Sequence, residues 1–180
     1  RTEVALERGV VLERLGRYED SEVTLRAGLE SAARWHQWEL MQEIAGELMF
    51  VVGYEQRRMD EGRQLWELTL GLAGDDPQAE ASARNIHANL LAAQGQLEQA
   101  EGEYRRSLEL REASLPAGDP EIAVSRSNLG LVLDQRGQHA DAEAEFRRAL
   151  AAMEAALGPR HPTAAMFRNN LANALTHAGE

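Results

Sequence analysis

Several residue types are missing or scarce in this chain of 180 residues. The absence of cysteine excludes disulfides, iron–sulfur clusters and thiol chemistry, and it is compatible with a reducing compartment. The longest strongly apolar run, Leu48 to Tyr54, is far shorter than the roughly 20 residues that a membrane-spanning helix needs. We therefore expect a cytoplasmic protein without a membrane segment.

Positive charge is also scarce. The chain has 30 acidic residues against 19 basic ones, and its formal net charge is −11. Nucleic acids and anionic membranes favour proteins with clustered positive charge, so this balance argues against both as general partners. The hydrophobic fraction of 43% is enough to bury a core. We expect a folded protein whose partners are proteins or peptides.

The residues that are present follow helical spacing almost throughout. Ala142, Phe146 and Ala149 lie three and four positions apart, as on one face of a helix. Helix starts are indicated by "DDP" at residues 75–77 and "GDP" at 118–120, in which Asp can cap the helix and Pro occupies its first turn. "RHP" at 160–162 repeats this pattern with a weaker cap. Turns between helices are indicated by Gly16, Gly95 and Gly137.

One stretch of the chain is a near copy of another. "RNIHANLLAAQGQLEQAEGEYRRSL" from Arg84 matches "RSNLGLVLDQRGQHADAEAEFRRAL" from Arg126 at an offset of 42 residues. The offset superposes Gly95 on Gly137 and Tyr104 on Phe146. A helix pair cannot bury its own apolar face, so a fixed period indicates that neighbouring pairs stack through the same interface.

These signals predict an all-α fold of four helix pairs and one terminal helix. The predicted helices span residues 2–15 and 18–32, 36–55 and 58–72, 78–94 and 97–113, 120–136 and 139–156, and 162–178. We expect them to form a single solenoid over residues 1–180, with repeats at 2–32, 36–72, 78–113 and 120–156 and a partial repeat at 162–180. Residues 1–77 are degenerate and residues 78–180 are regular.

The repeats resemble the tetratricopeptide repeat. The resemblance rests on the small and aromatic positions Ala142, Phe146 and Ala149, on "NLG" at 128–130 and on the turn glycine Gly137. The 42-residue period and "LGPRHPTAAMFRNNLANAL" from Leu157 are similar to the kinesin-light-chain-like subclass that is common in bacterial multidomain proteins. The similarity is strong over residues 78–180 and weaker over 1–77, where Arg57 replaces a turn glycine.

The resemblance implies a right-handed α-solenoid whose first helices line a groove that holds an extended peptide. We therefore expect a protein-binding or peptide-binding scaffold, without catalytic activity, that is a piece of a longer protein. Two alternatives are a self-association module and a ligand-sensing regulatory domain. The second alternative follows from a further resemblance to the regions that come after the kinase domain in some bacterial Ser/Thr protein kinases.

Amide and small polar side chains are candidates for the peptide-binding surface. Asn disfavours helix interiors, because its short amide competes with the backbone, so repeated Asn on matched helices calls for an explanation. One explanation is that these groups bind a peptide backbone, since an amide both donates and accepts hydrogen bonds. The other is that they join adjacent helices. The candidates are Asn85, Asn89, Ser127, Asn128, Asn169, Asn170 and Asn173.

Three arginines, Arg84, Arg126 and Arg168, also recur at intervals of 42 residues. If their guanidinium groups reach the groove, they can bind carboxylates of an acidic peptide. Alternatively, their stems pack between helices and their charged ends pair with Glu on a neighbouring helix. The sequence leaves both interpretations open.

Other residues give weaker signals. The three tryptophans, Trp35, Trp38 and Trp66, are expected to pack between helices rather than form a binding surface. The five histidines show no metal-binding spacing, so we expect no metal site. No phosphate loop, nucleophile elbow or convincing carboxylate pair is present, and we expect no cofactor.

The helix at the carboxy-terminal end lacks a following helix in this sequence. We expect part of its apolar face, formed by Leu171, Ala174 and Leu175, to be exposed and to promote self-association.

Overall fold

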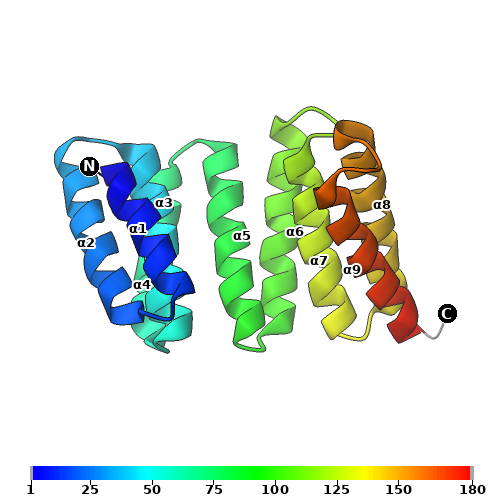
Figure 1. Ribbon diagram of the computed structural model, residues 1–180, viewed down its shortest axis with the longest axis horizontal. Helices are drawn as coiled ribbons and strands as arrows, with labels where there is room; N and C mark the ends of the chain where they lie inside the picture. Colours follow the sequence, from blue (N-terminus) through cyan, green and yellow to red (C-terminus); the bar gives the residue numbers. More distant parts are fainter. Residues whose placement is uncertain (1, 179–180) are drawn as a thin grey trace. The chain divides into compact units, whose positions relative to one another are not determined.

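The computed structural model describes residues 2–178, and these residues form nine α-helices and one π-helical segment (Figure 1). The all-helical fold of antiparallel pairs that the sequence predicts is confirmed. The last two residues of the expected partial repeat at 162–180 lie outside the described residues. The elements are α1 (Thr2–Arg14), α2 (Tyr18–Arg34), α3 (Trp38–Leu48), η1 (Met49–Glu55), α4 (Met59–Ala73), α5 (Pro77–Ala93), α6 (Leu97–Ser114), α7 (Pro120–Gln135), α8 (His139–Leu157) and α9 (Pro162–Ala178).

The predicted helix starts are confirmed by their caps. The side chain of Asp76 accepts a hydrogen bond from the backbone N–H of Gln78 at 2.9 Å, and Asp119 accepts one from Glu121 at 2.9 Å. At the start of α9, the ring nitrogen Nδ1 of His161 accepts from Thr163 N–H at 3.2 Å. Each cap is followed by Pro in the first turn, whose missing N–H would have no partner there.

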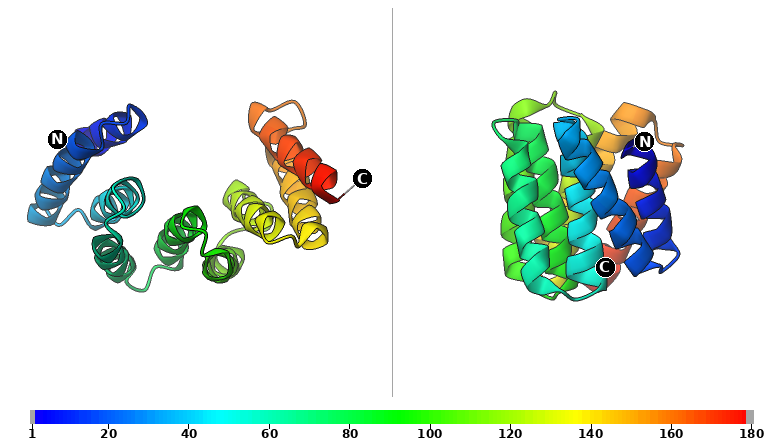
Figure 2. Two further views of the ribbon diagram at one scale, coloured as in Figure 1. Left: turned by 90° about the horizontal axis from the view of Figure 1, so that it is seen from below. Right: turned by 90° about the vertical axis from the view of Figure 1, so that its left-hand side faces the viewer.

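The chain divides into two units, Arg1–Gln94 and Gly95–Glu180, which we call unit 1 and unit 2. In unit 1, α2, α3, η1 and α4 pack around a core that includes Leu25, Ile44, Leu48 and Val51. In unit 2, α7, α8 and α9 pack around Ala149, Met153 and Phe167, among others. Figure 2 shows the helix pairs of each unit from two further directions. The single solenoid over residues 1–180 stays a prediction.

One predicted helix differs from the expectation. Residues 36–55 are not one continuous α-helix, because the α-helix begins at Trp38 and changes at Met49 into the π-helix η1. The backbone N–H of Gln56 bonds to the carbonyl of Val51, five residues earlier, at 3.0 Å. Within this segment, Gly53 faces Gly62 of α4 so closely that a Cβ on Gly62 would come within 2.7 Å of the Gly53 Cα.

None of the helices in the described part of the chain is both long enough and apolar enough to cross a membrane.

Candidate functional site

The amide candidates lie at several depths on α5, α7 and α9. Asn89, Asn169 and Asn173 are exposed, whereas Asn85 and Asn128 are half-buried. An exposed amide on a helix face can donate a hydrogen bond to the backbone of a partner and accept another from it. Their role in peptide binding stays a prediction.

Ser127 and Asn170 join two helices of unit 2. Asn170 Nδ2 donates a hydrogen bond to Ser127 Oγ at 3.1 Å, which links α9 to α7. Ser127 is buried, so its hydroxyl is not open to a ligand on the surface. For this pair the structure supports the second explanation, in which polar side chains hold adjacent repeats together.

The three repeated arginines all pair with glutamates of the chain. Arg84 Nε lies 2.7 Å from Glu80 Oε1, one turn earlier on the same helix. Arg126 pairs with Glu145 of α8 at 2.8 Å and with Glu112 of α6. Arg168 pairs with Glu154 of α8, with 2.8 Å between Nη2 and Oε1. These contacts support the structural interpretation of the arginines, since a peptide carboxylate would have to compete with a glutamate that is already in place.

The expected self-association face of α9 is partly covered within the chain. Ala174 is only 1% exposed and belongs to the interior, so it is not available to a second molecule. Leu171 and Leu175 are half-buried. Self-association through α9 stays a prediction, and it depends on these two leucines.

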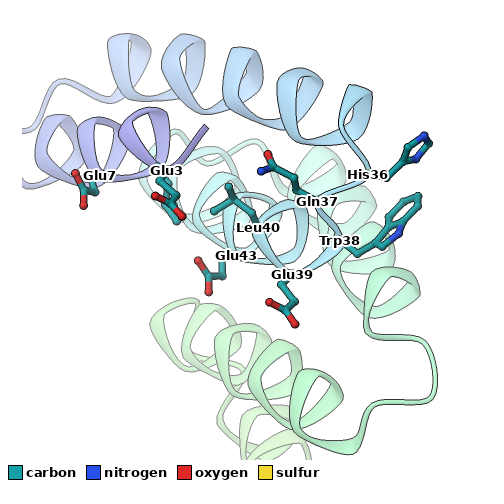
Figure 3. Close-up of a pocket in the computed structure, with 9 residues that line it drawn as sticks. Glu3, Glu7, His36, Gln37, Trp38, Glu39, Leu40 and Glu43 are labelled. Atoms are coloured by element: carbon teal, nitrogen blue, oxygen red, sulfur yellow. The ribbon is translucent and has the colours of Figure 1, made fainter. Parts of the chain in front are cut away.

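A hollow with a volume of about 710 Å³ lies between α1 and α3 in unit 1. Figure 3 shows the side chains of Glu3 and Glu7 from α1 and of Glu39 and Glu43 from α3 around this hollow. Its lining residues are Glu3, Leu6, Glu7, His36, Gln37, Trp38, Glu39, Leu40 and Glu43. The hollow therefore combines four carboxylates with two leucines and two aromatic rings.

The aromatic rings lie at one end of the hollow (Figure 3). The ring centroids of His36 and Trp38 are 5.6 Å apart, and the planes are tilted by 45°. Trp38 is 56% exposed and Trp35, outside the hollow, is 71% exposed. The expectation that these two tryptophans pack between helices is therefore wrong. Trp66, in contrast, is half-buried, and its ring stacks on the ring of His87 with 4.2 Å between the two ring centroids.

A further carboxyl of α3, outside the lining of the hollow, has a raised pKa. Glu47 follows Glu43 by one turn of α3, and burial together with the charge of Glu13 raises the pKa of its carboxyl. The guanidinium of Arg14 acts in the opposite direction but does not cancel the shift. Carboxylates that repel one another gain from a nearby cation.

A sequence model of the tetratricopeptide repeat family matches residues 78–155 and 121–180, which together make up more than half of the chain. The chain belongs to the tetratricopeptide repeat family. Members of this family generally serve as protein-interaction scaffolds and are typically non-catalytic. A comparison with curated proteins gives no significant match.

Several solved structures share this fold. BtubC (BKLC) from P. vanneervenii matches with a TM-score of 0.76 at 22% identity, over 95% of this chain and 70% of that chain. The TPR-like repeats of a candidate kinesin light chain from Podosopora anserina match with a TM-score of 0.75 at 16% identity. This match covers 99% of the present chain and 87% of that chain. PilF from Pseudomonas aeruginosa matches with a TM-score of 0.65 at 20% identity. This match covers 97% of the present chain and 68% of that chain. The predicted likeness to kinesin-light-chain-like repeats is confirmed for the fold.

The tetratricopeptide pattern did not reveal the residues of the hollow. Glu39 and Glu43 are one helical turn apart in the sequence, and so are Glu3 and Glu7, which predicts a charged stripe on each helix. Such stripes are usually solvated surface. Only the packing of α1 beside α3 shows that the two stripes border the same space.

Proposed function

We propose that this tetratricopeptide repeat chain is a protein-interaction module that binds an extended, basic segment of a partner protein along α1 and α3 of unit 1. The hollow between these helices is the observation that carries the proposal. It offers an open, concave surface of the kind on which ligands are held, and Leu6 and Leu40 are its two aliphatic lining residues.

The charge of the hollow selects the chemistry of the partner. Four of its nine lining residues are glutamates, and none of the lining residues is an arginine. An Arg or Lys side chain of a partner would pair with these carboxylates, and an Arg would do so with two parallel hydrogen bonds.

The aromatic end of the hollow supports the same partner. The exposed ring of Trp38 can stack with a guanidinium group or pack against the stem of a long side chain. One of the two interpretations of Arg126 and Arg168 in the sequence implied the opposite preference, for acidic peptides. Both guanidinium groups already pair with glutamates, which weakens that alternative.

Peptide binding by the purified chain tests this proposal. Two fluorescent nonapeptides would be compared, one alternating Arg with Ala and the other alternating Glu with Ala. We expect the Arg peptide to bind more tightly, with an affinity that falls as salt rises because exposed charges are screened. Glu39→Gln combined with Glu43→Gln should weaken binding about tenfold, which corresponds to about 1.4 kcal/mol.

Two exposed tryptophans provide a matched control. Trp38→Ala should weaken binding of the Arg peptide, whereas Trp35→Ala removes an exposed ring outside the hollow and should leave it unchanged. Equal effects of the two substitutions would contradict binding at the hollow. Tighter binding of the Glu peptide would contradict the proposed charge preference.

A further inference from the structure

Three side chains with metal-binding chemistry meet in unit 2. Asp134 lies in the last turn of α7, His139 is the first residue of α8, and His177 lies in the last turn of α9. Asp134 Oδ1 is 2.8 Å from His139 Nδ1, and Asp134 Oδ2 is 2.7 Å from His177 Nδ1. One ligand atom from each of the three residues lies within 4.8 Å of the other two.

The repeat architecture brings these residues together. Gly137 adopts a left-handed backbone with a φ of 77°, and the N–H of Gln138 bonds to the carbonyl of Leu133 at 2.9 Å. This tight turn places the start of α8 beside the end of α7. His177 follows Asp134 by 43 residues, one repeat period plus one position, so that it sits at the matching end of the next first helix. The three residues are too far apart in the sequence to form a recognisable metal-binding motif. The sequence-based expectation of no metal site therefore did not consider this cluster.

The ligand set has a chemical preference. Two imidazoles and one carboxylate suit divalent zinc, cobalt or nickel, whereas magnesium and calcium prefer oxygen ligands alone. Bond lengths of about 2.0–2.2 Å in a tetrahedral site place ligand atoms about 3.3–3.6 Å apart. The present contacts of 2.7 and 2.8 Å are hydrogen bonds, so a small opening of the side chains would admit an ion. A neutral imidazole then carries its proton on the other ring nitrogen.

The burial of the three residues fits such a site. The side chain of Asp134 is 14% exposed and is held by both histidines, whereas the side chain of His177 is 57% exposed and has room to adjust. The cluster is thus anchored on one side and open to solvent on the other. The net charge of −11 also favours the approach of a cation.

We propose that Asp134, His139 and His177 form a binding site for a divalent transition metal ion, with the open position occupied by water. The ion joins the end of α9 to the turn between α7 and α8. This site is separate from the peptide-binding hollow of unit 1, so either proposal can fail without the other.

Zinc binding by the chain without a histidine tag tests the proposal. Isothermal titration with Zn²⁺ in the presence of millimolar Mg²⁺ should show one site, because Mg²⁺ occupies nonspecific carboxylates. Substitution of Co²⁺ should give the visible absorption of a low-coordinate cobalt centre. His177→Ala, His139→Ala and Asp134→Asn should each lower Zn²⁺ affinity at least tenfold. Zn²⁺ should raise the melting temperature of the unsubstituted protein, but not that of His177→Ala.

Two histidines outside the cluster serve as controls. His36→Asn retains a residue that tolerates a positive φ, and His161→Asn retains an acceptor for the cap of α9. Both variants should bind Zn²⁺ like the unsubstituted protein, and circular dichroism would verify that every variant is folded. Equal Zn²⁺ affinity in His177→Ala and the unsubstituted protein would overturn the proposal. So would a lack of Zn²⁺ binding at millimolar concentration, which would leave a hydrogen-bonded cluster only.

Discussion

Unit 1 and unit 2 form the same helix-ending turn with different residues. In unit 2, Gly137 has a φ of 77°. Unit 1 has a glycine of this kind at Gly16, with a φ of 70°, but at two other turns the left-handed residues are His36 and Arg57, with φ of 55° and 57°. The turns at His36 and Gly137 contain the same backbone hydrogen bond, from the residue after the turn to a carbonyl five residues earlier. Gln37 N–H bonds to the carbonyl of Ala32 at 3.0 Å, and Gln138 N–H bonds to the carbonyl of Leu133 at 2.9 Å. The hydrogen bonds of the helix end define this turn, and glycine only lowers its conformational cost.

Close helix contacts also differ between the units. In unit 2, Gly130 of α7 makes room for the ring of Phe146, which lies 2.8 Å from the position of an added Cβ. In unit 1, Gly62 of α4 meets the backbone of Gly53, and no side chain lies between them. A ring can shift to accept a new methyl group more readily than a backbone can. The contact between Gly53 and Gly62 therefore tolerates less change than the contact between Gly130 and Phe146 does.

The two units each expose apolar side chains, such as Val4 of α1 in unit 1 and Met166 of α9 in unit 2. The acidic hollow between α1 and α3 is a feature of unit 1. The following predictions test these differences, from the largest expected effect to the smallest.

The contact between Gly53 and Gly62 in unit 1 should give the largest of the predicted effects, because backbone meets backbone. Gly62→Ala places a Cβ 2.7 Å from the Gly53 Cα, and the two helices must move apart. We expect the free energy of unfolding to fall by about 1–3 kcal/mol, as for other overpacked interiors. Urea denaturation followed by circular dichroism would measure it.

Gly71→Ala is the matched control, because Gly71 lies on the same helix and an added Cβ meets nothing within 4 Å. It should stabilise the protein by up to about 1 kcal/mol through the higher helix propensity of Ala. If both substitutions stabilise the protein to the same extent, the close contact between Gly53 and Gly62 does not exist.

The turns of the two units allow a reciprocal exchange. Arg57→Gly should raise the free energy of unfolding by about 0.5–1 kcal/mol, because glycine adopts the left-handed conformation without a steric penalty. Gly137→Arg should lower it by a similar amount, and Gly137→Asn by less, since Asn tolerates this conformation. Both positions are exposed, so packing contributes little. Destabilisation by Arg57→Gly would show that the Arg57 side chain supports unit 1 in another way.

The sequence predicted the helices well because their ends are local features. The caps at Asp76 and Asp119 and the turn at Gly137 depend on a few neighbouring residues. The pairing of Arg84 with Glu80 was also within reach, since one helical turn separates them. The pairing of Arg126 with Glu145 was not, because it depends on how α7 packs against α8.

The same distinction applies to the candidate sites. The hollow needs Glu3 and Glu43 from two helices, and the proposed metal site needs Asp134 and His177 from two repeats. The π-helix η1 accompanies the approach of Gly53 to Gly62, which no local pattern indicates. Residues that act together only after packing stay hidden when each helix is considered by itself.

The smallest expected effect concerns the acidic face of unit 1. Burial and the charge of Glu13 raise the pKa of Glu47 in the folded state, so folding favours its protonated form. The resulting stabilisation is fully present below the pKa of an unfolded glutamate, about 4.3, and is lost as the pH rises through the higher pKa of the folded state. At pH 7, Glu47→Gln should therefore raise the free energy of unfolding by about 0.5 kcal/mol, and this gain should shrink as the pH falls toward 4. Glu30→Gln, an exposed change on α2, serves as the control. Urea denaturation across this pH range measures the effect, and a Glu47→Gln variant that gains nothing at pH 7 would show that burial and the neighbouring charge do not disfavour the Glu47 carboxylate.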